Sequence, residues 1–401
     1  MKILFLTTVL PRNRRMGSEV ASQTIIDALR DNGHDVVVVG YMKKDDSFEL
    51  SPGEVSVGSR YIESRRAKLY PIYWLGLSLL KSLPYSAAKY WSHDYIGKVK
   101  SLLANLAYDA VFVDHAQLGW LLGISELQAV RNKAVAIAHN VEHDMYRQFA
   151  DGDTSVIAGW IYRREARLVE RVELALANLV KEVWVLTTDD ASFFSRIKTN
   201  GRVQVLSLPA AASACAPGSI VKRFDIGLIG SWAWKANAEG LRWFLDTVYP
   251  RLPIKLSISV AGRGASWLVG RYPNIDYLDF VPDAQQFLMQ ARVVAIPTLR
   301  GGGIQIKTLD AIASGSPIVA TTLALRGIND PPKTLKIANT PIEFAALLSA
   351  TAAAPEESRG CEEAHTWSHL REKEFRRQVN AWVHEIARSC MKKEVGSEGV
   401  L

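Results

Sequence analysis

Short runs of apolar residues recur along this chain, and each is followed by a longer segment with a helical pattern. The runs show little polar alternation, which is typical of strands buried on both faces of a parallel sheet. After the first run, residues 18–30 place their apolar side chains on one helical face, and Gly33 follows where a helix would end. The alternation predicts an α/β architecture with doubly wound, Rossmann-like parallel sheets.

The alternation occurs in two series with a break between them. The segment PAAASACAPGS at the break is rich in proline and small residues, as linkers are. We therefore expect one Rossmann-like domain at residues 1–208, a linker at 209–222 and a second such domain at 223–371. A final helix at 372–391, which we expect to cross back to the first domain, precedes a tail at 392–401. The apolar runs lie at residues 3–7, 36–39, 110–114, 134–138, 183–186 and 203–206, and then at 225–230, 256–262, 292–297 and 317–321.

The composition narrows the class of protein. The net charge of +7 favours anionic partners such as phosphates or acidic lipid surfaces. Cys215, Cys361 and Cys390 are far apart and form no CxxC pair, which argues against a disulfide framework or a zinc site. The amino terminus is unlike a signal peptide, because its charges follow a short apolar run, and no stretch approaches the ~18 apolar residues of a membrane span. We expect a cytoplasmic protein, or one held peripherally at the inner face of the cell membrane.

The segment that most constrains function is PTLRGGGIQIKTLDAIASGSPIVATT, residues 297–322. An apolar run ends at Pro297, three glycines follow at 301–303, and we expect a helix to begin near Ile304. Backbone N–H groups at a helix N-terminus bind phosphate, and Lys307 in the first turn would add a positive charge. Asp310, one turn further, could bond ribose hydroxyls. Three glycines alone would also suit a flexible turn, but with Lys307 and Asp310 the spacing predicts a nucleotide site.

This segment resembles the donor-binding motif of glycosyltransferase family four, whose members are retaining enzymes of the GT-B architecture. The resemblance implies two facing domains, the first for the acceptor and the second for a nucleotide-sugar donor. Two positions depart from the pattern: the second acidic residue, usually Glu, is Asp310, and the first Glu of the wider family corresponds to Gly302. The matching positions are Gly301, Gly303, Lys307, Leu309, Ala311, Ala313, Gly315 and Pro317.

The resemblance extends over nearly the whole chain and implies further donor contacts in the second domain. Gly230 and Ser231 would approach the diphosphate from the loop after the domain's first strand. Lys235 would be a second cation for the phosphates, although a solvated loop lysine is the alternative. Gly262 would lie in a loop that flanks the nucleotide base. With these, the predicted donor site includes Gly301, Gly302, Gly303, Ile304, Lys307 and Asp310.

Three more residues complete the predicted donor site. Phe280 and Val281 would lie against the base, on the resemblance of DFVPD (279–283) to a base-flanking loop. Family members also place a glycine-rich loop after the first strand of the chain, where it reaches over the diphosphate. This chain keeps only Gly17 there, and a plain helix start explains that residue equally well.

His139 is the predicted catalytic residue. It directly follows the apolar run 134–138 and thus lies at a strand end. In the family a histidine at this point lies beside the transferring sugar, and a histidine can share protons near neutral pH. A structural histidine is the alternative. His139 and His143 are four residues apart but do not form an HExxH motif, so we expect no metal site.

The segment from Arg60 to Trp91 differs from the rest of the chain. It carries Arg60, Arg65, Arg66 and Lys68, and then the run YPIYWLGLSLLKSLPYSAAKYW. Basic residues beside aromatic and aliphatic ones suit an anionic membrane interface. Two core helices with a basic surface are the alternative, and part of the segment must be core in either case.

The resemblance implies a retaining transferase that moves a hexosyl unit from a nucleoside-diphosphate sugar to an acceptor hydroxyl, without a metal or other cofactor. We expect a saccharide or lipid-linked acceptor of bacterial polysaccharide assembly, an anionic membrane surface and no nucleic acid as partners. The alternatives are a nucleotide-sugar 2-epimerase, for whose elimination step no convincing carboxylates are found, and a noncatalytic nucleotide-sugar binding protein. No GxGxxG follows the first strand and no Walker motif occurs, which argues against dinucleotide and P-loop proteins.

Overall fold

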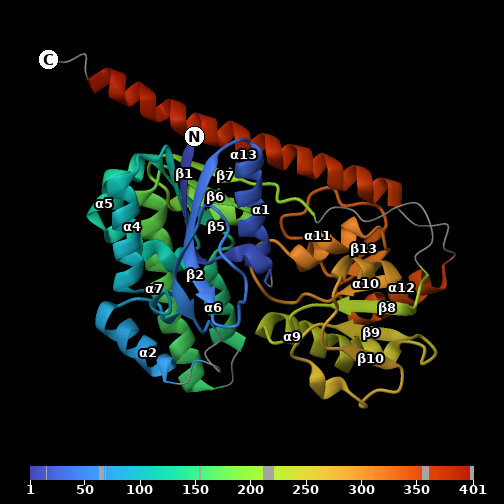
Figure 1. The fold of residues 1–401 in the computed structure, drawn as a ribbon. Helices are drawn as coiled ribbons and strands as arrows, with labels where there is room; N and C mark the ends of the chain where they lie inside the picture. Colours follow the sequence, from blue (N-terminus) through green and yellow to red (C-terminus); the bar gives the residue numbers. More distant parts are fainter. Residues whose placement is uncertain are drawn as a thin grey trace. The chain divides into compact units, whose positions relative to one another are not determined.

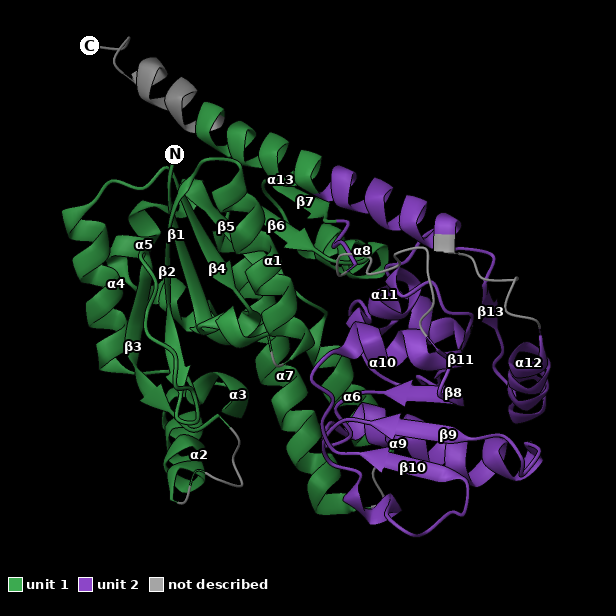
Figure 2. Ribbon diagram, turned by 45° about the vertical axis from the view of Figure 1, so that its right-hand side comes forward, with its two compact units in different colours: residues 1–206, 376–401 green, residues 207–375 purple. Residues whose placement is uncertain are grey.

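The computed structural model describes residues 1–14, 16–62, 67, 69–152, 155–210, 221–354 and 361–397 (Figure 1). The chain divides into two compact units, coloured separately in Figure 2. Unit 1 comprises residues 1–206 and 376–401, and unit 2 comprises residues 207–375. Most of the predicted linker, residues 211–220, lies outside the described residues, as do Cys215 and the side chains of Cys361 and Cys390.

Unit 1 is built on a 7-stranded sheet whose paired strands are all parallel. The strand order is β3-β2-β1-β4-β5-β6-β7, so the chain winds outward from β1 in one direction and from β4 in the other. The switch point between β1 and β4 is where ligands bind in open α/β sheets. The strands are β1 Lys2–Val9, β2 Asp35–Lys43, β3 Glu54–Arg60, β4 Ala110–Asp114, β5 Ala134–Ala138, β6 Glu182–Val185 and β7 Arg202–Val205.

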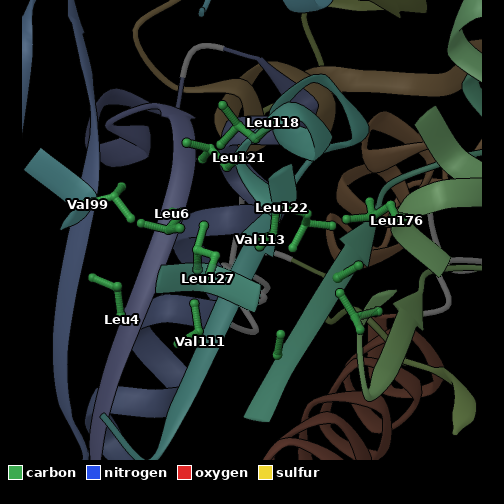
Figure 3. Close-up of a cluster of buried hydrophobic side chains, with 14 of the residues drawn as sticks. Leu4, Leu6, Val99, Val111, Val113, Leu118, Leu121, Leu122, Leu127 and Leu176 are labelled. Atoms are coloured by element: carbon green, nitrogen blue, oxygen red, sulfur yellow. The ribbon is translucent and has the colours of Figure 1, made fainter. Parts of the chain in front are cut away.

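Helices cover both faces of this sheet. On one face, strand residues such as Leu4, Leu6 and Val113 pack against the 3-10 helix η2 (Ala116–Gly123) and neighbouring helices in one continuous core (Figure 3). Burial on both faces explains why these strands lack polar alternation. The helices are α1 Gly17–Asp31, α2 Tyr70–Lys81, α3 Tyr85–Ala88, α4 His93–Asn105, α5 Ser125–Ala129, α6 Glu142–Gly152, α7 Val156–Leu179 and α8 Thr188–Ile197.

The opposite face carries a row of aromatic rings that ends on the last helix. Phe5 lies beside Phe112 in the sheet, with ring centroids 5.8 Å apart, and the Phe112 ring contacts Trp184. The Trp184 ring contacts Trp382 of α13 (Cys361–Ser397), with centroids 5.3 Å apart. This helix therefore packs on unit 1 with its later part, while residues 361–375 belong to unit 2.

Unit 2 repeats the plan with a 6-stranded parallel sheet. Its order, β10-β9-β8-β11-β12-β13, places a second switch point between β8 and β11. Ile226, Val260 and Val293 pack against Phe244 and Phe344 in its core. The strands are β8 Phe224–Ile229, β9 Ile258–Ala261, β10 Ile275–Leu278, β11 Ala291–Ile296, β12 Ile318–Ala320 and β13 Leu335–Ile337, and the helices are α9 Lys235–Trp243, α10 Ala284–Gln290, α11 Ile306–Ala313 and α12 Pro341–Ala353.

The architecture was predicted correctly, but three strands were missed and three helix boundaries differ from the prediction. The strands β3, β10 and β13 lie at sheet edges and are only partly buried, so they lack the apolar runs of the inner strands. The helix expected near Ile304 begins at Ile306. The last helix begins at Cys361 and ends at Ser397, so it is longer than predicted on both sides and takes in much of the expected tail. Among the helices in the described part of the chain, none combines the length and apolar character needed to cross a membrane.

Candidate functional site

The triple-glycine loop lies at the end of β11, beside the switch point of unit 2. Gly301 has a φ of 126° and Gly303 a φ of 67°, which are conformations that favour glycine. Ile304 precedes α11, and Gln305 is its N-cap residue without a side-chain capping bond. The first N–H groups of α11 therefore leave room for an external acceptor beside the loop.

Lys307 links three elements of unit 2. It is half-buried in the first turn of α11, and its Nζ donates a hydrogen bond to Asn237 Oδ1 of α9 at 3.0 Å. Asn237 Nδ2 in turn donates to the backbone oxygen of Ser231, in the loop after β8, at 3.1 Å. Burial lowers the pKa of Lys307 to about 8. The tertiary structure thus brings the predicted residues Lys307 and Ser231 together through Asn237, which the sequence analysis missed.

The predicted glycines after β8 and β9 have a packing role. Gly262 has a φ of 112°, and a side-chain Cβ at this position would lie 1.9 Å from the backbone oxygen of Gly230. Trp232 joins the same two loops, because its Nε1 donates to the Ala261 oxygen at 2.9 Å. Gly262 is therefore required where the two strand-end loops touch, whatever else binds there, whereas a Cβ at Gly230 would make only an ordinary contact with the Trp232 ring at 3.4 Å.

Phe280 and Val281 follow β10 at the edge of the sheet. The Phe280 ring is 65% exposed, and the Arg263 guanidinium carbon lies 5.9 Å from its centroid. Val281 is half-buried. An exposed aromatic face beside a guanidinium can stack against a flat ring such as a nucleotide base.

The remaining predicted residues of unit 2 lie on the same helices. Lys235 begins α9, and Asp310 belongs to α11; both are half-buried. The backbone oxygen of Asp310 accepts a hydrogen bond from Gln285 Nε2 at 3.0 Å. In unit 1, Gly17 begins α1 and is exposed, which fits a plain helix start.

His139 follows β5 in unit 1 and is bonded to a buried carboxylate. Its Nε2 lies 2.7 Å from Asp114 Oδ1, at the end of the adjacent strand β4. Thr7 and Ser22 hydroxyls donate to Asp114 Oδ2, each at 2.7 Å. Burial opposes ionisation of Asp114, but the neighbouring imidazoles and the Ser22 bond lower its pKa to about 2. An ionised Asp114 therefore accepts the Nε2–H of His139 and fixes its tautomer.

His115 stacks on His139, with ring centroids 4.1 Å apart and an angle of 17° between the rings. It has a φ of 74°, and burial lowers its pKa to about 4. The possible ligand atoms of Asp114, His115 and His139 lie within 4.8 Å of one another, as in a metal site. Hydrogen bonds already engage both Asp114 oxygens, so they explain this cluster without an ion.

Asp114 and His115 were missed by the sequence analysis, although a signal was present. Asp114 is the only polar residue of the run AVFVD and ends a buried strand, which is where site residues of a parallel sheet gather. What the sequence does not reveal is that β4 and β5 are neighbours, which makes Asp114 the partner of His139.

Residues 223–352 match the family model described as glycosyl transferases group 1. The matched residues span the sheet of unit 2 and include Lys307, Asn237 and Ser231. Over a longer stretch, the chain is 23% identical to an uncharacterized 44.6 kDa protein in the cps region of Klebsiella pneumoniae, across 86% of this chain and 89% of that protein.

Solved glycosyltransferase structures share the fold of the whole chain. Anabaena HepE, in complex with UDP and glucose, has a TM-score of 0.62 at 15% identity, covering 97% of this chain and all of that one. Sucrose-phosphate synthase from Thermosynechococcus elongatus has a TM-score of 0.58 at 15% identity, covering 100% of both chains. WaaG, a glycosyltransferase involved in lipopolysaccharide biosynthesis, has a TM-score of 0.59 at 14% identity, covering 96% of this chain and 98% of that one. The predicted GT-B fold is thus confirmed.

Proposed function

We propose that this chain is a retaining glycosyltransferase that moves a hexosyl unit from a nucleoside-diphosphate sugar to an acceptor hydroxyl. The observation that carries the proposal is the link from Lys307 through Asn237 to Ser231. It holds a cation beside a triple-glycine loop and a helix N-terminus, a combination that suits a diphosphate leaving group. The complexes of HepE with UDP and UDP-glucose support a nucleotide sugar as the donor.

The donor would lie along the strand ends of unit 2. We expect its diphosphate at the Gly301–Gly303 loop and Lys307, and its base against Phe280 and Arg263. The helix N-terminus and Lys307 would stabilise the charge of the departing diphosphate, so we expect no metal ion in the reaction.

His139 would serve the acceptor side. With Nε2–H donated to Asp114, its Nδ1 has no hydrogen-bond partner among the residues that the structure describes and can accept from a sugar or acceptor hydroxyl. A double displacement would need a carboxylate beneath the anomeric carbon, and the position where the wider family carries its first Glu is Gly302 here. Same-face attack by the acceptor, with His139 holding the hydroxyl, needs no such carboxylate.

We further propose a lipid-linked saccharide as acceptor and a peripheral position on an anionic membrane. The cps-region relative and the lipopolysaccharide role of WaaG support polysaccharide assembly. The segment 60–91 supports the membrane: Trp74 and Leu77 form a small core, while most large apolar side chains of α2 are exposed. The predicted Arg65, Arg66 and Lys68 lie outside the described residues.

The start of α7 carries a second group of exposed apolar residues. Further along α7, Arg164 Nη2 donates to Ser78 Oγ of α2 at 3.1 Å, and Glu165 Oε2 accepts from Tyr85 N of α3 at 2.7 Å. Exposed Lys81, Arg163 and Arg167 lie on the same helices and would attract anionic lipids. We call the apolar residues of both helices the apolar surface: Leu69, Tyr70, Ile72, Tyr73, Leu75, Leu79, Leu80, Val156, Ile157, Trp160 and Ile161.

A thermal-shift screen with UDP, GDP, ADP and dTDP tests the donor proposal. A nucleotide at 100 times its Kd stabilises the protein by about 2.7 kcal/mol. We expect one of the four to do so, and Lys307→Ala to weaken its binding by about 1.5–3 kcal/mol, the worth of a charge-assisted hydrogen bond. Lys336→Ala, at the exposed sheet edge of the same unit, is the matched control. The donor site would be refuted if no nucleotide stabilises the protein, or if Lys307→Ala and Asp310→Ala both bind as the wild type does.

A further inference from the structure

The two segments that leave β4 and β5 carry a second polar pair beyond Asp114 and His139. The first pair joins Asp114 to His139 at 2.7 Å. Three residues further along each segment, Gln117 Nε2 of η2 donates to Glu142 Oε2 of α6 at 2.7 Å. Two side-chain pairs therefore bridge the same segments, one after the other, beginning at the switch point of unit 1.

Glu142 is almost buried, with 8% of its surface exposed, yet it has no cationic partner among the described residues. Burial, and then the charge of Glu173, raise its pKa to about 8, so the carboxyl is protonated at neutral pH. A protonated carboxyl offers one donor and further acceptor capacity. This is the hydrogen-bonding character that complements a hydroxyl rather than an anion.

Gln117 supplies the complementary observation. Its side-chain oxygen is buried and receives no hydrogen bond from any residue in the described part of the chain. Leaving such a buried acceptor without a partner is unfavourable. A hydroxyl bound beside the pair would donate to this oxygen and could accept from the Glu142 carboxyl.

We infer that the Gln117–Glu142 pair is a binding position for a second hydroxyl of a neutral sugar ring whose reacting hydroxyl lies at His139. The inference rests on the proposed function and names the acceptor class at that site. A phosphate at the pair would meet the amide oxygen of Gln117, which repels it, and a carboxyl with no cation beside it among the described residues.

Several titratable groups surround Glu142, and each of them could contribute to the pH dependence of sugar binding. Glu173 of α7 accepts from the Glu142 backbone N at 2.6 Å and from His143 Nδ1 at 2.6 Å. Tyr90, before α4, and Tyr146 of α6 both interact with Glu142, and burial raises the pKa of each tyrosine well above its usual range. Burial also raises the pKa of Glu173, so the Glu142→Gln variant is what assigns a titration near pH 8 to Glu142, whose ionisation should weaken sugar binding.

The experiment uses n-octyl glucoside, galactoside and mannoside as acceptor probes with the full chain. Saturation-transfer NMR measures binding of each glycoside, and a transfer assay measures the acceptor KM and kcat with the donor that carries the base found by thermal shift. We expect Glu142→Ala and Gln117→Ala to raise the Kd and KM of the bound glycoside at least tenfold, with kcat within threefold of the wild type. Glu142→Gln keeps a neutral group of the same shape, so its Kd and KM should stay within threefold of the wild-type values. The rise in KM above pH 8 that we expect of the wild type should be absent in this variant.

Glu165→Gln is the matched control, because Glu165 is another buried carboxylate of unit 1 that accepts from a backbone N–H. The inference is overturned if Glu142→Ala and Gln117→Ala keep the wild-type Kd, or if the wild type binds none of the three glycosides. Failure of the proposed function looks different: no nucleotide would stabilise the wild type and no nucleoside diphosphate would be released, whatever happens to glycoside binding.

Discussion

The Lys307 ammonium loses its charge only about one pH unit above neutrality, because burial lowers its pKa to about 8; its only described hydrogen bond goes to the uncharged Asn237. A diphosphate beside Lys307 would favour the charged form. Binding of the nucleotide is therefore coupled to the protonation of this one side chain.

This coupling predicts a pH dependence with a definite sign. Below pH 8 the free protein already carries the charge, whereas above pH 8 binding must take up a proton. We expect nucleotide affinity to fall by up to about tenfold per pH unit above 8, measured by calorimetry from pH 7 to 9.5. Lys307→Arg stays charged throughout and should remove the slope. A slope that persists in Lys307→Arg would assign the titration to another group.

His139 and Asp114 form the corresponding unit on the acceptor side. We expect His139→Ala to lower kcat by about 10²–10⁴, the usual worth of a positioned acid–base group. Nucleotide affinity should hardly change, because the Lys307 group lies in unit 2 and His139 in unit 1. Steady-state kinetics and calorimetry on the same variant separate the two effects. A fully active His139→Ala enzyme would make His139 a structural residue.

At the scale of elements, the inner strands and the edge strands obey different rules. Inner strands such as β4 and β5 are buried along their whole length, and their sequences are continuous apolar runs. Edge strands such as β3 and β13 are partly exposed and mix polar residues into short segments. The helix α2 is buried on one side, where Trp74 and Leu77 lie in a small core, and exposed on the rest of its surface.

The exposed side of α2 and the start of α7 predict membrane binding. We expect Ile157→Ser and Trp160→Ser to reduce sedimentation with anionic liposomes, and to reduce most strongly the part that survives high salt. The remainder should be salt-sensitive, because exposed charges are screened over about 10 Å in 0.1 M salt. Ile342→Ser of α12 is the control, since Ile342 is 68% exposed and Ile157 is 74% exposed. Equal binding to neutral and anionic liposomes at low salt would contradict the role of the basic residues.

At the scale of the whole molecule, the candidate residues are divided between the units. The Lys307 group belongs to unit 2 and the Asp114–His139 pair to unit 1, each at a switch point of its sheet. The chain runs from unit 1 to unit 2 and returns along α13, whose Trp382 packs on Trp184.

For the complete reaction we expect retention of the anomeric configuration. Same-face attack guided by the departing phosphate requires stabilisation of the leaving charge, for which the Gly301–Gly303 loop and Lys307 are placed, and it requires no carboxylate at position 302. Proton NMR of the first product formed from an α-linked donor should show an α linkage. A β-linked product would overturn the mechanism.

The amino-acid sequence by itself determined the architecture and part of the site. Continuous apolar runs require burial on both faces, so they indicate parallel sheets wherever they occur, and β4 and β5 have the predicted bounds. Lys307 could be placed in a first helical turn after three glycines because local spacing alone decides this. For most strands, the continuous apolar run was therefore enough to predict a position inside the sheet.

Only the tertiary structure decided which residues meet. Asp114 and His139 are 25 positions apart, Gln117 and Glu142 are 25 apart, and Asn237 and Lys307 are 70 apart. Each contact depends on strand order, because parallel strands bring their carboxyl ends to one edge whatever their separation in sequence. The role of Gly262 likewise arises from the close approach of another loop, and the burial that changes the pKa of Lys307 and Glu142 comes from elements packed around them. Strand order and the burial of these particular polar groups are properties of the folded chain, and no local pattern encodes them.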